Sequence, residues 1–191
     1  LGADLLNNNL DKSIQLVKNF KSLSIYNEPE HPQKFSINLL IKTLRDSYQS
    51  ALKKHNTQLT LIFIDDVIVE SYKDVIVDVL TQLMENSLMH AFFEVESPGI
   101  TIRVSASNDQ LMINYFDNGL GLSDEGKDKI FELFYTTKRN SNCTGLGMPI
   151  VYNQVTQKLQ GNITYTQPSL QGTGFTITIP MLYKTEAYRL I

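Results

Sequence analysis

Two pairs of glycines bracket a polar stretch in the second half of the chain, and an acidic residue precedes the first pair. Asp117, Gly119 and Gly121 are spaced D-x-G-x-G, and Gly145 and Gly147 are spaced G-x-G. An ionised carboxylate only accepts hydrogen bonds, so a buried Asp117 needs a donor, and the exocyclic amine of adenine is such a donor. We expect Gly119 and Gly121 to adopt positive φ and to let the backbone approach a flat ring, because glycine has no Cβ atom. A plain loop with two turns is the alternative.

The second glycine pair precedes Pro149, which fits the first turn of a helix. Apolar residues then recur at helical spacing, at Ile150, Val151, Val155 and Leu159. A glycine-rich turn that opens a helix presents free N–H groups and the positive end of the helix dipole, which suits phosphate. The sequence therefore predicts a base at the first glycine pair and phosphates at the second.

Two further elements must position these groups. The apolar run of residues 111–116 predicts a strand, which places Asp117 at its carboxyl end. Residues 72–93 predict a helix in which Asn86 and His90 share a face with apolar residues at steps of three and four, namely Val75, Val79 and Leu83. Two polar groups on an apolar stripe need partners, so this helix is expected to border the same site.

The rest of the globular part shows weaker patterns. We expect a strand around residues 34–38, a helix over about 39–55, strands over 58–64 and 67–69, and a closing hairpin of residues 161–167 and 174–180. The turn at Asp65 and Asp66 is expected to join two paired strands. Its adjacent carboxylates are expected to be solvated, with a metal site as the alternative.

Five segments of this chain resemble, in order, the nucleotide-binding boxes of the sensor histidine kinase catalytic domain. That domain is a member of the superfamily that also holds gyrase, the heat-shock chaperone ATPases and the mismatch-repair ATPases. The segments are residues 82–92 (asparagine box), 117–121 (first glycine box), 130–138 (phenylalanine box), 144–147 (second glycine box) and 172–180 (closing strand with its terminal proline). The resemblance covers about residues 35–180.

The resemblance implies a fold and a function. The expected fold is α+β, a two-layer sandwich of a mixed β-sheet and helices (a Bergerat-type ATP-binding fold) with an N-terminal helical arm. The expected function is transfer of the γ-phosphate of ATP to a histidine outside this chain. The alternatives are a degenerate nucleotide-binding or partner-switching module without phosphotransfer, and a hydrolytic ATPase of the gyrase type. Gln82 argues against hydrolysis, because it stands where the hydrolytic relatives have a glutamate, and an amide is no general base at neutral pH.

The resemblance also assigns roles within the site. Asn86 would ligate Mg²⁺ through its amide oxygen, a hard neutral ligand, with a satisfied core asparagine as the alternative. Lys138 would neutralise the β- and γ-phosphates from a lid formed by residues 122–144. The other nucleotide contacts would come from His90, Phe131, Phe134, Thr144, Leu146 and Thr173 together with the glycines named above. Phe131 and Phe134, at positions i and i+3, are expected to anchor a short helix in the lid.

Residues 3–24 predict an amphipathic helix with an apolar stripe. Packing on its own domain is one interpretation. The resemblance instead implies the second helix of a dimerisation hairpin, so that the chain divides into a partial dimerisation helix (1–25), a linker (26–34) and an ATP-binding domain (35–191). It further implies a homodimer formed through that hairpin in the full-length protein, with a response regulator receiver domain as the partner.

Composition limits the remaining possibilities. The chain has 191 residues, is 42% hydrophobic and 19% charged, and has a net charge of −3, so it carries no basic stripe for nucleic acid. No apolar run approaches the roughly 18 residues of a membrane span, and the lone Cys143 excludes an internal disulfide. We expect a cytoplasmic fragment of a longer protein, with room for sensor and membrane-anchored parts upstream. We also expect Asp117→Asn to weaken ADP binding while barely changing the stability of the ligand-free protein.

Overall fold

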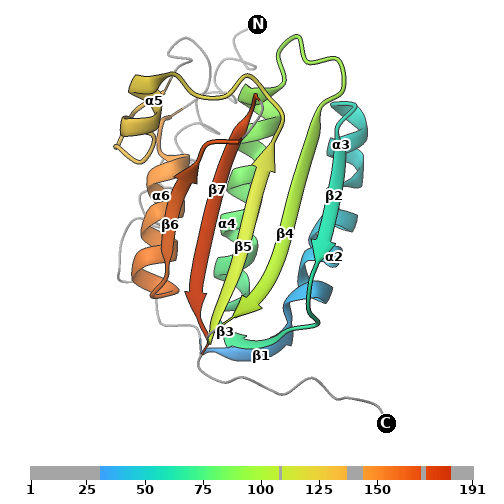
Figure 1. Ribbon diagram of the computed structural model, residues 1–191, viewed down its shortest axis with the longest axis vertical. Helices are drawn as coiled ribbons and strands as arrows, with labels where there is room; N and C mark the ends of the chain where they lie inside the picture. The colour runs from blue at the N-terminus through green and yellow to red at the C-terminus, as the bar shows by residue number, and fades with distance from the viewer. Residues whose placement is uncertain (1–30, 108, 137–143, 169–170, 182–191) are drawn as a thin grey trace, which may run out of the picture.

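A computed structural model describes residues 31–107, 109–136, 144–168 and 171–181. A five-stranded mixed sheet has the order β2-β4-β5-β7-β6, in which β2 and β4 are parallel and the other neighbours antiparallel. Figure 1 shows the helices gathered behind this sheet, while its other face carries none. The architecture confirms the expected α+β sandwich. Among the described residues, no helix is long and apolar enough to span a membrane.

The elements alternate along the chain. The strands are β1 (Gln33–Ser36), β2 (Gln58–Phe63), β3 (Ile68–Ser71), β4 (Gly99–Ser107), β5 (Gln110–Asp117), β6 (Asn162–Thr166) and β7 (Thr173–Pro180). The helices are α2 (Ile37–Ser47), α3 (Gln49–Lys54), α4 (Lys73–Asn86), α5 (Asp124–Lys129) and α6 (Gly147–Asn153). Two π-helical turns, η1 (Ser87–Ala91) and η2 (Gln154–Lys158), extend α4 and α6.

The core lies between the sheet and α4. Alternate residues of β5 are buried, with Leu111, Ile113, Tyr115 and Asp117 on the helix side. They meet the apolar stripe of α4 that the sequence predicted, which includes Val75, Val79, Leu80 and Leu83. One acidic residue therefore sits at the end of an apolar row, inside the core.

Several expected elements are corrected in detail. The strand expected over residues 58–64, which is β2, does not form a hairpin with β3, because β2 pairs with β4 and β3 pairs with β1 in a separate two-stranded sheet. The helix expected over 39–55 breaks at Tyr48 into α2 and α3. The helix expected over 72–93 changes to a π-helical turn after Asn86. The closing hairpin of β6 and β7 is confirmed.

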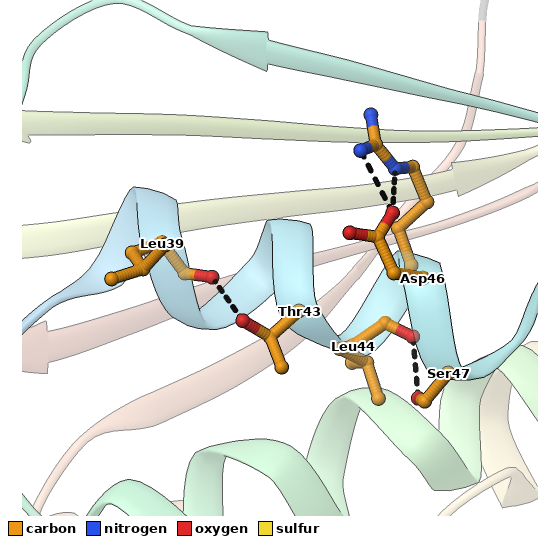
Figure 2. A network of polar contacts seen from close by, with 6 residues as sticks. Leu39, Thr43, Leu44, Asp46 and Ser47 are labelled. Atoms are coloured by element: carbon orange, nitrogen blue, oxygen red, sulfur yellow. Dashed lines mark hydrogen bonds and ion pairs between the residues drawn. The ribbon is translucent and has the colours of Figure 1, made fainter.

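Helix α2 is stabilised by contacts within itself and at its start. Ser36 caps it by accepting a hydrogen bond from the Leu39 N–H. Figure 2 shows the contacts on its surface, where the Ser47 hydroxyl donates to the Leu44 carbonyl at 2.7 Å and Arg45 pairs with Asp46 at 2.8 Å. These groups serve the helix alone, which makes them useful reference positions for changes in the site.

Candidate functional site: a buried carboxylate between two glycine turns

Asp117 ends β5 and is 3% exposed. Its Oδ1 atom accepts the N–H of Gly119 at 3.0 Å and the N–H of Thr173 at 3.2 Å. Its Oδ2 atom accepts the Ser87 hydroxyl at 2.7 Å. Burial raises the pKa of this carboxyl, and the three hydrogen bonds lower it. The predicted position at a strand end is correct, and the carboxylate is held on three sides by the protein itself.

Two hydroxyls beside Asp117 were not found from the sequence. The Tyr115 hydroxyl lies 2.8 Å from Ser87 Oγ and 3.1 Å from the Leu83 carbonyl oxygen, and all three groups are buried. A usable signal was present, because Tyr115 stands two residues before Asp117 on the inward-facing side of the strand, and Ser87 follows Asn86 directly. Only the structure shows that they meet.

The first glycine pair makes close contacts within the protein itself. Gly121 has φ of 78° as predicted, but Gly119 is not in the positive-φ region. A Cβ atom on Gly119 would overlap Ala91 of η1, including its carbonyl oxygen, and that oxygen accepts the Leu120 N–H at 2.9 Å. Gly119 is therefore needed for close contact between the loop and η1. The positive φ expected at Gly119 is not found, whereas the need for a residue without a Cβ atom is, because η1 occupies the space beside it.

Asn86 lies where α4 meets the second glycine pair. A Cβ atom on Gly147 would lie 3.1 Å from Gln82 Oε1 and 3.5 Å from Asn86 Oδ1. The Asn86 Nδ2 atom is buried and makes no hydrogen bond within the described residues. An amide left without protein partners in the interior is available to a ligand. His90, one turn further on in η1, is half-buried.

The rest of the second glycine box packs tightly. Gly145 has φ of 66°, and a Cβ atom there would lie 2.6 Å from the backbone of Phe134, whose N–H donates to the Gly145 carbonyl at 3.0 Å. Leu146 is fully buried, while Thr144 and Gly147 are half-buried. The buried Leu146 thus fixes the turn, and Pro149 lies in the first turn of α6, as predicted.

The two phenylalanines of the phenylalanine box behave differently. Phe131 packs on Tyr152 at 5.2 Å and on Phe175 at 6.2 Å between ring centres. Phe134 is 61% exposed and has a left-handed backbone with φ of 65°. The helix α5 ends before both, so the prediction that the pair anchors a helix was wrong. Only Phe131 is an anchor, because the left-handed residue turns the chain away from the core.

Other predicted residues complete the picture. Thr173 is buried opposite Asp117 in the β5–β7 register and supplies a backbone N–H to it. Lys138 lies outside the described residues. Within those ranges, no group of three or more His, Cys, Asp or Glu side chains is placed to hold a metal ion. At the Asp65–Asp66 turn, the Asn38 side-chain amide donates to the Asp65 carbonyl oxygen at 2.9 Å and to Asp66 Oδ1 at 3.2 Å.

A hollow of about 440 Å³ opens on the helix-free face, where β2 and β4 begin. Phe116 and Asn118 line it, and they flank Asp117, whose side chain points to the opposite face. Both amide atoms of Asn118 are already bonded, one to the Gly99 N–H and one to the Ser97 carbonyl. The hollow is therefore separate from the carboxylate.

Comparison with known proteins matches this geometry to one family. A family model described as histidine kinase-, DNA gyrase B- and HSP90-like ATPase matches residues 72–182. The chain is 28% identical over 82% of its length to the autoinducer 2 sensor kinase/phosphatase LuxQ of Vibrio parahaemolyticus, and 26% identical over 94% to the sensor histidine kinase WalK of Bacillus subtilis. It spans 19% of LuxQ and 30% of WalK.

Solved structures agree. The catalytic domain of histidine kinase ThkA matches with a TM-score of 0.70 at 25% identity, over 80% of this chain and 97% of that one. ThkA in complex with response regulator protein TrrA matches with a TM-score of 0.75 at 22% identity, over 93% of this chain and 50% of that one, and at this identity the match shows the fold alone.

Proposed function

Since the chain belongs to the family of histidine kinase-, DNA gyrase B- and HSP90-like ATPases, we propose that it is the ATP-binding catalytic part of a two-component sensor histidine kinase. The observation that carries this proposal is that Asn86, whose buried Nδ2 atom has no partner within the described residues, lies against Gly147, while the next residue along the chain bonds the buried Asp117. Ser87 follows Asn86 in the chain and bonds Asp117, so base and phosphate groups would meet one continuous surface. In this proposal residues 35–191 form the ATP-binding domain, residues 26–34 the linker and residues 1–25 part of a dimerisation hairpin.

The base is recognised at Asp117. Its carboxylate accepts only, and its position at the end of β5 lets it accept from the amine of adenine. Thr173 and Gly119 hold the carboxylate through their N–H groups. His90 lies in η1, whose Ala91 packs against Gly119, and Gly121 follows in the same loop, while Phe131 packs on Tyr152 of α6 and Phe175 of β7.

The phosphates are placed at the other end. Gly145 and Gly147 open α6 against Asn86, and Thr144, Leu146 and Phe134 shape that turn. Mg²⁺ fits here, because the Asn86 side chain, whose buried Nδ2 atom makes no hydrogen bond within the described residues, carries an amide oxygen near Gly147 that would serve as one ligand, and Mg²⁺ commonly takes only one or two ligands from protein. When bound, the ion would neutralise phosphate charge. In this proposal Lys138 also neutralises the phosphates.

The reaction is phosphoryl transfer to a histidine outside this chain. Gln82 lies beside Gly147 and offers an amide where a water-activating base would be needed, so the site positions ATP without promoting hydrolysis. The histidine kinase ThkA has been solved with a response regulator protein. By analogy, the full-length protein would pass the phosphoryl group to a receiver domain and would act as a homodimer.

A nucleotide titration tests the proposal. The chain should bind ATP, ADP and a non-hydrolysable ATP analogue by calorimetry, and Mg²⁺ should strengthen the triphosphates more than ADP. Absence of nucleotide binding with and without Mg²⁺ would refute it.

A labelling assay separates the kinase from its alternatives. The chain alone should bind ATP yet neither label itself nor release phosphate, whereas a chain extended upstream through the missing hairpin helix should gain an acid-labile, alkali-stable phosphoryl group. In that assay Lys138→Ala should reduce transfer far more than ADP affinity, since ADP has no γ-phosphate. Phosphate release at about 1 s⁻¹ or more would indicate a hydrolytic enzyme, and an extended dimer that never labels would indicate a degenerate module.

A further inference from the structure

The two oxygens of Asp117 are not equivalent. A carboxylate offers about four lone-pair positions, two on each oxygen. The N–H groups of Gly119 and Thr173 fill both positions on Oδ1, at 3.0 and 3.2 Å. The Ser87 hydroxyl fills one on Oδ2, at 2.7 Å. Within the described part of the chain, one acceptor position is left, and it belongs to Oδ2.

The hydroxyls beside Oδ2 have one orientation that supports the carboxylate, in which the single Tyr115 proton points to Ser87 and not to the Leu83 carbonyl oxygen, 3.1 Å away. The carboxylate ends the chain of hydrogen bonds because it cannot donate, so Ser87 donates to it. The Ser87 oxygen is then free to accept from the Tyr115 hydroxyl, 2.8 Å away. Burial raises the pKa of Tyr115 well above its ordinary value, so this hydroxyl keeps its proton and remains a donor.

We propose that Ser87 and Tyr115 are positioning residues that hold Asp117 as an acceptor-only group with a single open position on Oδ2, and that they thereby restrict the site to a 6-amino purine. The inference rests on the proposed function, because it assumes that a purine nucleotide occupies the site. In an adenine the exocyclic N–H fills the open position. A 6-oxo purine in the same place would turn its O6 acceptor toward Oδ2, and the saturated Oδ1 offers no alternative contact.

This selection of a 6-amino purine holds only while the buried Asp117 carboxylate stays ionised. Burial opposes the charge, and the bond from Ser87 is the largest of the effects that oppose burial. Few other ionisable groups face the carboxyl. The neighbouring strand β7 has none, β4 has only Arg103 on the other face of the sheet, and α4 places Glu85 against Tyr48. Tyr115 and the half-buried His90 of η1 are the titratable neighbours.

The first test needs no nucleotide. Titration of the Asp117 side-chain carbon by ¹³C NMR in the ligand-free chain should give a midpoint that rises by about one pH unit in Ser87→Ala, the equivalent of one hydrogen bond to a charged group. Tyr115→Phe should raise it by less, because it acts through Ser87, and it keeps the ring that packs in the core. The control Ser47→Ala removes a part-buried hydroxyl hydrogen bond in α2 (Figure 2) and should leave the midpoint unchanged. His90 ring signals in the same spectra separate its titration.

The second test is the ratio of the dissociation constants of inosine and adenosine diphosphates as a function of pH. ADP should be preferred by at least tenfold in the wild type, and the pH at which this preference fades should move upward in both variants together with the NMR midpoint. An unchanged midpoint in both variants, or equal losses for both nucleotides at every pH, would overturn the inference. A wild-type chain that binds neither nucleotide would overturn the proposed function, while the NMR result would still decide whether the two hydroxyls hold Asp117 ionised.

Discussion

Replacing Asp117 by asparagine tests how the carboxylate is held as well as what it binds. The N–H groups of Gly119 and Thr173 both point at the position of Oδ1. An asparagine must therefore place its carbonyl oxygen there and its amine at the position of Oδ2. One N–H of that amine can donate to Ser87, whose hydroxyl can turn to accept. The other points into the open position, so the substitution replaces an acceptor by a donor.

The magnitudes follow from the bonds that change. ADP loses a hydrogen bond to a charged group and meets a donor, so its affinity should fall by about 2 kcal/mol, roughly thirtyfold. Inosine diphosphate should gain affinity. The stability of the ligand-free protein changes through two opposing effects. Three bonds to a charge become weaker bonds to a neutral amide, whereas the cost of burying that charge is removed. We therefore expect a net change of less than about 1 kcal/mol, or less than about 2–4 °C in Tm, and the sequence-based expectation of a barely changed stability stays a prediction.

The sign of the pH dependence gives a further check on the same variant. Burial raises the pKa of Asp117 above that of the unfolded chain, so the folded state binds more protons between the two values. The contribution of Asp117 to the free energy of unfolding should therefore fall as the pH rises through that window. Asp117→Asn should lack this pH dependence when the free energy of unfolding is measured by urea titration at several pH values.

The effect of replacing an acceptor by a donor at the Oδ2 position is measured by calorimetry with ADP and inosine diphosphate. Asp46→Asn makes the same chemical change on the exposed surface of α2 (Figure 2) and should leave both affinities unaltered. Equal weakening of ADP and inosine diphosphate by Asp117→Asn would refute the assignment of Oδ2 to the base.

Three other tests, with five substitutions, address the site's remaining parts. Asn86→Ala should remove the Mg²⁺-dependent part of ATP affinity and spare ADP binding without Mg²⁺. It should change the unfolding free energy by less than about 1 kcal/mol, because the amide nitrogen makes no hydrogen bond within the described residues. An equal loss of ATP affinity with and without Mg²⁺ would contradict this. Gly119→Ala should destabilise the ligand-free chain by about 1–3 kcal/mol, because the new Cβ atom would overlap η1. Gly99→Ala should cost less in the same thermal melts, because the nearest atom would lie 3.6 Å from the new Cβ atom. Phe131→Ala should cost about 3–5 kcal/mol and Phe134→Ala less than about 1 kcal/mol in denaturant unfolding, and comparable costs would argue against a single anchor.

Much of the architecture could be predicted because it depends on local patterns. The apolar run of residues 111–116 placed Asp117 at the carboxyl end of a strand, and the stripe of residues 72–93 placed Asn86 on a helix that borders the same site. What failed depended on long-range packing. The residues around Gly119 give no sign that Ala91 of η1 fills the space beside it, and i, i+3 spacing does not reveal that Phe134 adopts a left-handed backbone. Strand pairing was mistaken at the Asp65–Asp66 turn because β2 finds its partner beyond α4.

That distant partner determines where the chain can be cut. Strand β2 covers one edge of β4, with Gln58 opposite Gly99, although α4 and η1 lie between them in sequence. A fragment beginning at residue 72 would retain Asn86, Asp117 and both glycine turns, yet it would expose the edge of β4 and the apolar surface that α2 and β2 cover. An uncovered apolar strand edge recruits strands from other molecules. Such a fragment should self-associate in sedimentation experiments, whereas one that begins before β1 should not.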